Sequence, residues 1–312
     1  QLGAVADVEV TLEANPGTVE RGCFAAYRDA GVTRVSLGAQ SFDDRHLAAL
    51  GRIHAREETL AAVDELRAAG LDNFNLDLMY ALPAQAVDEA LADLEQALAL
   101  EPAHLSHYQL TLEPGTAFER RPPPLPDEDA AWQMQVACQS RLADAGFRHY
   151  EVSAYARPAR ECRHNLNYWR FGDYLGIGAG AHGKLSLPAS DAGRSPEERC
   201  DRVLRRWKHK HPATYLAQAG TAAAIGADTV IAPGQLPFEF MLNALRLREG
   251  FVLDHFEART GLSRDAIAQP LGRAIAEGWL SSDDARVMPT ESGLRFANDV
   301  ISLFLPDLPE AG

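Results

Sequence analysis

The stretch NFNLDLMY, residues 73–80, decides the fold class of this 312-residue chain. Its apolar side chains occupy every second position, and two asparagines and an aspartate stand between them. Successive side chains of a strand point to opposite faces, so this pattern gives one apolar face and one polar face. Segments 8–16, 33–40 and 104–114 show the same period of two. Strands buried on both faces are instead continuous apolar runs.

Helical patterns separate these strands along the chain. Ser41 is the expected N-cap of a short second helix, and Asp127 is the expected N-cap of the fifth. Repeated strand–helix units predict an α/β fold with a parallel sheet covered by helices, open or closed as a barrel. We predict helices over 17–31, 41–52, 56–70, 87–101 and about 127–145, and a last strand over 150–156.

The polar strand faces predict an interior that is lined for a ligand. The simplest arrangement turns the apolar faces outward against the helices and leaves the polar faces inside. In the fourth strand, this places Thr111 inside and Tyr108 on the outer face. Four polar residues then lie near the C-terminal ends of their strands, where βα barrels carry their sites: Glu13, Gln40, Asp77 and Thr111. The alternative is that the polar faces meet solvent at an open edge.

The chain is expected to have three parts. Residues 1–186 carry the strand–helix rhythm of the predicted barrel. Residues 187–235 are poorly periodic and predict a connector with a hairpin or a short helix. Residues 236–305 hold short helices and a polar hairpin, which is typical of a winged-helix-like module.

Composition excludes several classes of protein. The net charge of −14 argues against nucleic-acid binding, because phosphate contacts need excess lysine and arginine. Four cysteines without close spacing argue against a disulfide framework and favour a reducing, cytoplasmic location. No apolar run approaches the roughly 20 residues of a membrane span.

The stretch ECRHNLNYWRFGDYLGIGAGAHG, residues 161–183, combines a cysteine and histidines with aromatic rings and glycines. Together they offer a soft ligand, an imidazole and flat aromatic surface in one place. The glycines would let the backbone pass close to a bound ligand. The alternative interpretation is a capped structural turn whose aromatic rings pack under the barrel.

Six segments together resemble one known family. They are TLEANPGTVE, RVSLGAQSF, LGRIHAREE, NFNLDLMYALP, HLSHYQLTLEPGT and HNLNYWRFGDYLGIGAGAHG. In this order they resemble the HemW family of haem chaperones, which is related to oxygen-independent coproporphyrinogen III oxidase within the radical S-adenosylmethionine superfamily. The resemblance covers essentially the whole chain. It implies a partial radical-SAM (βα)6-type barrel of parallel strands with a small winged-helix-like HemN C-terminal domain.

The resemblance also implies a [4Fe-4S] cluster and S-adenosylmethionine in the barrel. Carried over residue by residue, it assigns the S-adenosylmethionine contacts to Glu13, Gln40, Arg52, Asp77 and Thr111. Carboxylates suit hydroxyls and the amine of this ligand, and an arginine suits its carboxylate. The Cys-x3-Cys-x2-Cys motif that ligates the family's cluster is absent from this chain. We therefore expect an N-terminally truncated sequence, whose first strand has an open edge, with a degenerate family member as the alternative.

The run from His164 to Trp169 resembles the motif that marks the chaperone branch. It implies haem contacts by His164, Asn165, Tyr168 and Trp169, with His164 on the iron and Cys162 as a second choice. Their chemistry fits, because imidazole and thiolate are standard axial ligands of haem iron and aromatic rings offer flat surface to a porphyrin. The implied function is to bind haem and to transfer it to apo-cytochromes and other respiratory haem proteins. The alternative is the oxidase itself, which decarboxylates coproporphyrinogen III oxidatively. The implied partner is an apo-haem acceptor protein; a membrane-bound acceptor, peripheral membrane contact and a homodimer are left open.

Overall fold

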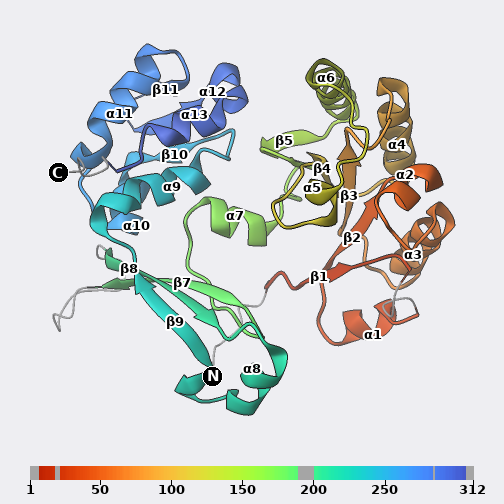
Figure 1. Ribbon diagram of the computed structural model, residues 1–312, viewed down its shortest axis with the longest axis horizontal. Coiled ribbons are helices and arrows are strands. Elements are labelled where there is room, and N and C mark those ends of the chain that lie inside the picture. Colours follow the sequence, from red (N-terminus) through yellow and green to blue (C-terminus); the bar gives the residue numbers. More distant parts are fainter. Residues whose placement is uncertain (1–6, 18–21, 189–199, 284, 307–312) are drawn as a thin grey trace. The chain divides into compact units, whose positions relative to one another are not determined.

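The computed structural model describes residues 7–17, 22–188, 200–283 and 285–306 (Figure 1). The chain divides into two compact units, Gln1–His164 and Asn165–Gly312. The boundary falls inside helix α7 (Arg163–Trp169). The division of the sequence into three parts stays a prediction.

A six-stranded sheet forms the centre of the first unit. The strands lie in the order β1-β2-β3-β4-β6-β5, and β1 to β4 are parallel, as the sequence predicts. In the described part of the chain the sheet is open, with β1 and β5 at its edges. The strands are β1 (Thr11–Ala14), β2 (Arg34–Gln40), β3 (Phe74–Tyr80), β4 (His104–Gln109), β5 (Arg148–Glu151) and β6 (Ala154–Ala156).

The single strand predicted over 150–156 is wrong. The chain reverses at Val152 and Ser153, so that β5 and β6 form an antiparallel hairpin. Ser153 fixes the turn, because its carbonyl oxygen accepts a hydrogen bond from the backbone N–H of His107 at 2.8 Å. Neither glycine nor proline stands in this segment, so the sequence carries no turn signal there.

Among the described residues, four helices cover the apolar face of this sheet: α1 (Phe24–Asp29), α3 (Arg56–Ala68), α4 (Val87–Ala99) and α6 (Glu128–Asp144). The first unit also contains α2 (Asp44–Ala49) and α5 (Ala117–Arg120). Asp127 caps α6 as expected, because its side chain accepts from the backbone N–H of Ala130. The predicted cap Ser41 is wrong. Asp43 caps α2, while the buried Ser41 hydroxyl donates to Asp93 at 2.6 Å.

The hydrophobic core of the first unit lies between the sheet and these helices. Leu37, Leu76 and Leu105 of three adjacent strands are fully buried there. Leu66 of α3 and Leu94 of α4 meet them from the helix side. Burying each of these side chains contributes about 1.5–3 kcal/mol. The apolar strand faces therefore turn outward to the helices, as the alternation predicts.

The second unit has an antiparallel sheet of β7 (His182–Pro188), β8 (Cys200–Lys208) and β9 (Ile225–Val230). Within 187–235, where the sequence predicts a hairpin or a short helix, the described residues include the short helix α8 (Pro212–Gln218), and β8 pairs antiparallel with both β7 and β9. Phe240 centres the core of the following module, where Phe171, Phe251 and Phe256 pack around its ring. That module comprises α9 (Leu236–Ala244), β10 (Phe251–Val252), α10 (Leu253–Thr260), α11 (Asp265–Ala276), β11 (Leu280–Ser282), β12 (Arg286–Pro289), α12 (Glu291–Arg295) and α13 (Ala297–Ser302).

Candidate functional site

The polar face of the first unit's sheet carries a connected set of side chains. The parallel register places Glu13 opposite Ser36, and Ser36 opposite Asn75. Asn75 Nδ2 donates to Ser36 Oγ at 2.9 Å and to Asp77 Oδ1 at 2.8 Å. Ser106 joins from β4, because its hydroxyl donates to Asn75 Oδ1 at 3.2 Å. Four adjacent strands thus present one hydrogen-bonded polar surface.

Gln40 ends β2 in an unusual backbone conformation beside this surface. Its φ is 67°, and the register of β2 against β3 shifts between Leu37 and Gln40. This left-handed conformation costs a non-glycine residue about 1–2 kcal/mol, so the bulge has to be held by its surroundings. Tyr108 provides one such contact, since its hydroxyl donates to Gln40 Oε1 at 2.9 Å. Gly38 leaves room, because a Cβ there would lie 3.0 Å from Gln40 Nε2.

Tyr108 therefore lies on the polar face, and the expectation that placed it outside is wrong. His107 points the opposite way and stacks on Tyr80, with ring centroids 4.7 Å apart. The fourth strand carries polar residues at both alternating positions, so its sequence defines no unique face. Thr111 lies beyond the end of β4, where its hydroxyl donates to Glu113 Oε1 at 2.8 Å.

Two carboxyl groups of the polar surface, Asp77 and Glu13, have raised pKa values. Burial raises the pKa of the half-buried Asp77 above its ordinary value, and the hydrogen bonds from Asn75, Ser106 and Ser36 only partly oppose this. Loss of surrounding water also raises the pKa of Glu13, and the charge of Asp77 adds to the effect. Two carboxyl groups that resist ionisation side by side favour a cationic ligand, because positive charge relieves both.

Three of the five predicted S-adenosylmethionine contacts, Glu13, Gln40 and Asp77, come together at this surface. The fourth, Arg52, is exposed, and its Nη1 donates to Asn15 Oδ1 at 3.3 Å, one residue beyond β1. Thr111 bonds to Glu113 instead of to any of these groups. The roles of all five toward S-adenosylmethionine stay predictions.

A chain of buried hydrogen bonds leads from this surface to the start of α7. His104 Nδ1 lies 2.7 Å from Asn75 Oδ1, and His104 Nε2 lies 2.8 Å from the Tyr150 hydroxyl. The Tyr150 oxygen also accepts from the backbone N–H of Cys162 at 3.4 Å. Burial lowers the pKa of His104 to about 3, so its ring is neutral. Sequence reasoning missed His104 and Tyr150, because no local pattern links residues this far apart.

Helix α7 begins at the carboxylate of Glu9. Glu9 Oε1 accepts from the backbone N–H of Arg163 at 3.0 Å and of His164 at 3.4 Å. A carboxylate at this end satisfies N–H groups that have no partner within the helix and complements the helix dipole. Residues 163–169 of the stretch therefore form a capped helix, and the purely structural role of the alternative interpretation stays an alternative. His164 lies exposed in its first turn, close enough to Glu13 to act weakly on the pKa of that carboxyl.

The aromatic residues of α7 pack within the second unit. The Tyr168 ring meets Tyr174 edge-on, with centroids 4.6 Å apart. The guanidinium of Arg246 lies over the Trp169 ring, 4.3 Å from its centroid. The indole N–H of Trp169 is buried without a hydrogen-bond partner among the described residues. Such a donor is costly and suits a site where a further acceptor binds.

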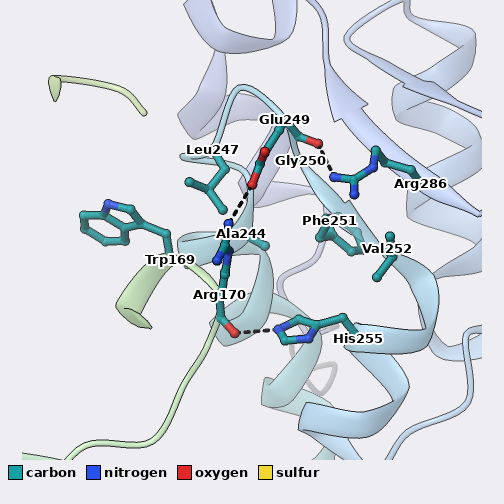
Figure 2. A pocket seen from close by; sticks show the side chains of 10 residues that line it. All are labelled: Trp169, Arg170, Ala244, Leu247, Glu249, Gly250, Phe251, Val252, His255 and Arg286. Atoms are coloured by element: carbon teal, nitrogen blue, oxygen red, sulfur yellow. Dashed lines mark hydrogen bonds and ion pairs between the residues drawn. The ribbon is translucent and has the colours of Figure 1, made fainter. Parts of the chain in front are cut away.

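A cavity of about 190 Å³ adjoins Trp169. Figure 2 shows the side chains that line it. His255 Nε2 bonds to the backbone oxygen of Arg170 at 2.6 Å across it. The Arg170 side chain pairs with Glu249 at 3.0 Å, and Arg286 donates to the Glu249 backbone oxygen at 2.9 Å. Pockets for drug-sized ligands measure roughly 300–1,000 Å³. The cavity is therefore too small to enclose a porphyrin.

The glycine-rich stretch serves the packing of the chain against itself. A Cβ on Gly176 would lie 2.1 Å from the backbone oxygen of His182, so this glycine permits the two backbones to meet. The expectation that the glycines approach a ligand finds no support at this position. Sequence reasoning missed Lys184, which is 2% exposed and bonds Asp173 Oδ1 at 3.0 Å and the Phe171 carbonyl at 2.9 Å.

The described residues do not fit a [4Fe-4S] cluster. Such a cluster needs converging cysteine thiolates. Cys23 precedes α1, Cys138 lies in α6 and Cys162 precedes α7, and no group of three metal-binding side chains in the described part of the chain includes a cysteine. These three thiols therefore provide no ligand set for a cluster.

Comparisons with known proteins place the chain in a family. Residues 2–97 match the Radical SAM superfamily, and residues 231–296 match the HemN C-terminal domain. The protein named heme chaperone HemW from Escherichia coli (strain K12) is 45% identical over 307 residues, covering 98% of this chain and 77% of its own length. The chain belongs to the HemW family. The Haemophilus influenzae HemW is 44% identical, over 96% of this chain and 75% of its own length.

HemW membership confirms the resemblance that the six segments carry. The solved structure of coproporphyrinogen III oxidase (HemN) from Escherichia coli, described as a radical SAM enzyme, has a TM-score of 0.75. It covers 96% of this chain and 70% of the oxidase, and at 19% identity it shows the fold alone. Among the described residues, no helix is both long and apolar enough to cross a membrane.

Proposed function

We propose that the protein is a haem chaperone, which binds haem and delivers it to apo-haem proteins. One observation carries this function, namely the 45% identity over 98% of the chain with the Escherichia coli protein named heme chaperone HemW. The alternative, oxidative decarboxylation of coproporphyrinogen III, is supported only by a structural likeness at 19% identity. That likeness speaks for the fold and leaves the chaperone as the better supported function.

Membership of the radical SAM superfamily implies S-adenosylmethionine and a [4Fe-4S] cluster as the family's cofactors. The polar surface suits the first of these. Glu13 and Asp77 would stabilise its positive charge, and Gln40 would bind its polar groups beside Tyr108. S-adenosylmethionine is a cofactor of radical chemistry when bound. The part of these side chains would be to hold the molecule and to orient it.

The haem site that we propose is the surface of α7. His164 and Tyr168 are four residues apart and share one helix face, while Asn165 and Trp169 share the adjacent face. His164 is exposed, so its imidazole can reach iron from solvent. The neighbouring cavity is too small to enclose a porphyrin, which leaves the ring on an open surface. An open site suits a carrier, because its cargo has to leave again.

Replacing the proposed iron ligand tests the site. We expect His164→Ala to weaken hemin binding at least several-fold and to change the Soret band, because the imidazole ligand is lost. Tyr168 and Trp169 remain to hold the porphyrin, and the fold should stay intact by circular dichroism. Cys162→Ala should have a much smaller effect, because its buried side chain lies beneath the start of the helix.

The matched control is His211→Ala. His211 is exposed and lies in the second unit before α8, so its loss should leave the spectrum unchanged. His54 is unsuitable as a control, because it is buried and bonded to the Ala39 carbonyl at 3.1 Å. Unchanged affinity and spectrum in His164→Ala would show that His164 is not the ligand.

The location and the partners of the protein belong to the same proposal. We propose a cytoplasmic protein on the basis of its cysteine content, with an apo-haem protein as acceptor. Sedimentation equilibrium tests for a homodimer. Co-sedimentation with anionic vesicles tests peripheral membrane contact, for which the basic segment 199–211 is the candidate. The alternative for that segment is a solvated hairpin face.

A further inference from the structure

Three side chains of metal-binding type meet on the helix side of the first unit. Asp43 caps α2, His46 lies in its first turn, and Glu89 lies in the first turn of α4. One ligand atom from each residue lies within 4.8 Å of the other two. These residues stand apart from the polar strand surface and from α7, so the inference does not depend on the proposed haem function.

His46 supplies an independent sign of a missing partner. Its side chain is 5% exposed, and its Nε2 is buried without a hydrogen bond among the described residues. This nitrogen faces Glu89 Oε2 at 3.6 Å, which is longer than an N–H···O hydrogen bond. Glu89 Oε2 already accepts from the backbone N–H of Ala86 at 2.8 Å, so the buried ring nitrogen of His46 is the atom that lacks a partner.

The spacing fits two ligands of one metal ion. Zinc binds imidazole nitrogen and carboxylate oxygen at about 2.0–2.2 Å, and in tetrahedral geometry two such ligands lie about 3.4 Å apart. The 3.6 Å between His46 and Glu89 is close to that separation. The ligand atom of Asp43 lies within 4.8 Å of those of the other two residues. One imidazole and two carboxylates also balance the charge of a divalent ion.

Without a metal ion, the guanidinium of Arg45 supplies the positive charge next to the two carboxylates. Its Nη2 pairs with Asp43 Oδ2 at 2.5 Å and with Glu89 Oε1 at 2.7 Å. The Arg45 side chain is 72% exposed, so it can swing into solvent at small cost. It does not satisfy His46, because Arg45 makes no hydrogen bond to the Nε2 of that residue. A metal ion would satisfy all three residues at once.

We propose that Asp43, His46 and Glu89 bind a divalent transition-metal ion of the zinc class, with water as the fourth ligand. The ion links α2 to α4 in competition with Arg45. Because the ion would bind residues of both helices, its binding stabilises the first unit.

Zinc titration of the full 312-residue chain tests the site. We expect Zn²⁺ to raise the melting temperature, and we expect His46→Gln and Glu89→Gln to bind it at least ten-fold more weakly. Arg45→Gln should bind zinc several-fold more tightly, because the competing cation is gone. Co²⁺ in place of Zn²⁺ separates this site from the cysteines, since thiolate ligands give a near-ultraviolet charge-transfer band.

Two outcomes would overturn the site. The first is that Glu89→Gln binds zinc as tightly as the wild type. This variant keeps the test valid even if His46→Gln does not fold. The second is equal or weaker zinc binding by Arg45→Gln. His211→Gln is the matched control, and it should bind zinc at this site as the wild type does, because His211 lies in the other unit.

Discussion

The hydroxyl of Tyr150 has a structural role that its position in the sequence does not reveal. It bonds His104 Nε2 at 2.8 Å and the backbone N–H of Cys162 at 3.4 Å, both in buried surroundings. Tyr150→Phe leaves these two groups without this partner. We expect the free energy of unfolding to fall by about 1–3 kcal/mol, which urea denaturation measures.

Tyr80→Phe is the matched control for Tyr150→Phe. Tyr80 is also buried, but it stacks its ring on His107 and would keep that contact as a phenylalanine. We expect a clearly smaller change in stability. Equal losses in the two variants would mean that the link from His104 to Cys162 adds nothing to the fold.

At the scale of elements, α7 depends on a residue far away in the sequence. Glu9→Gln keeps an oxygen near the helix start but removes the negative charge that its first N–H groups bind. We expect a loss of about 0.5–1 kcal/mol and faster hydrogen exchange at residues 163–166. Glu113→Gln, which changes a carboxylate outside this contact, should leave the exchange of α7 unaltered. Unchanged exchange in Glu9→Gln would contradict this role.

A second prediction at this scale concerns the stability of the loop that precedes β7. Gly176→Ala places a methyl group 2.1 Å from the His182 carbonyl oxygen, so one backbone segment has to move. We expect destabilisation of about 1–3 kcal/mol or more, measured by thermal unfolding. Gly234→Ala is the control, since a Cβ there meets nothing within 4 Å. A neutral Gly176→Ala would mean that the loop packs differently in solution.

The alternation of polar and apolar residues predicted most of the first sheet. It did not predict which way the side chains point in β4, where both sets of alternate positions include polar residues. Glu13, Gln40 and Asp77 could be placed on one face because hydrophobic residues stand between them. Tyr108 could not, since β4 has polar residues on both faces. The cluster of Asp43, His46 and Glu89 was not predictable either. Its members come from two helices, and only tertiary packing brings α2 and α4 together.

At the scale of the whole molecule, two buried histidines predict a dependence of stability on pH. Burial lowers the pKa of His104 to about 3 and that of His107 to about 4. In the unfolded chain, both histidines take up a proton as the pH falls below their ordinary pKa of about 6.5. In the folded chain, they stay neutral at that pH. Stability is therefore present above pH 6.5 and is lost as the pH falls toward 4. Each histidine contributes about 1.4 kcal/mol per pH unit.

Asp77 works in the opposite direction, because its raised pKa lets the folded chain bind a proton first as the pH falls. Glu13 acts in the same direction as Asp77, so the contribution of a histidine is obtained by comparing wild type with a histidine variant. Urea unfolding between pH 7 and pH 5 measures it, and His107→Gln should make the loss of stability shallower. The exposed His211→Gln should keep the wild-type slope. Identical slopes for wild type and His107→Gln would disprove the assignment.

The boundary between the two compact units falls between His164 and Asn165, within one continuous helix. Anyone who divides the gene at that natural border for crystallography or for complementation would cut the motif itself. The first fragment would end on the proposed iron ligand, and the second would begin with the asparagine and the aromatic residues. Neither fragment could form α7. A pair of co-expressed halves should therefore keep residues 163–169 together on one chain.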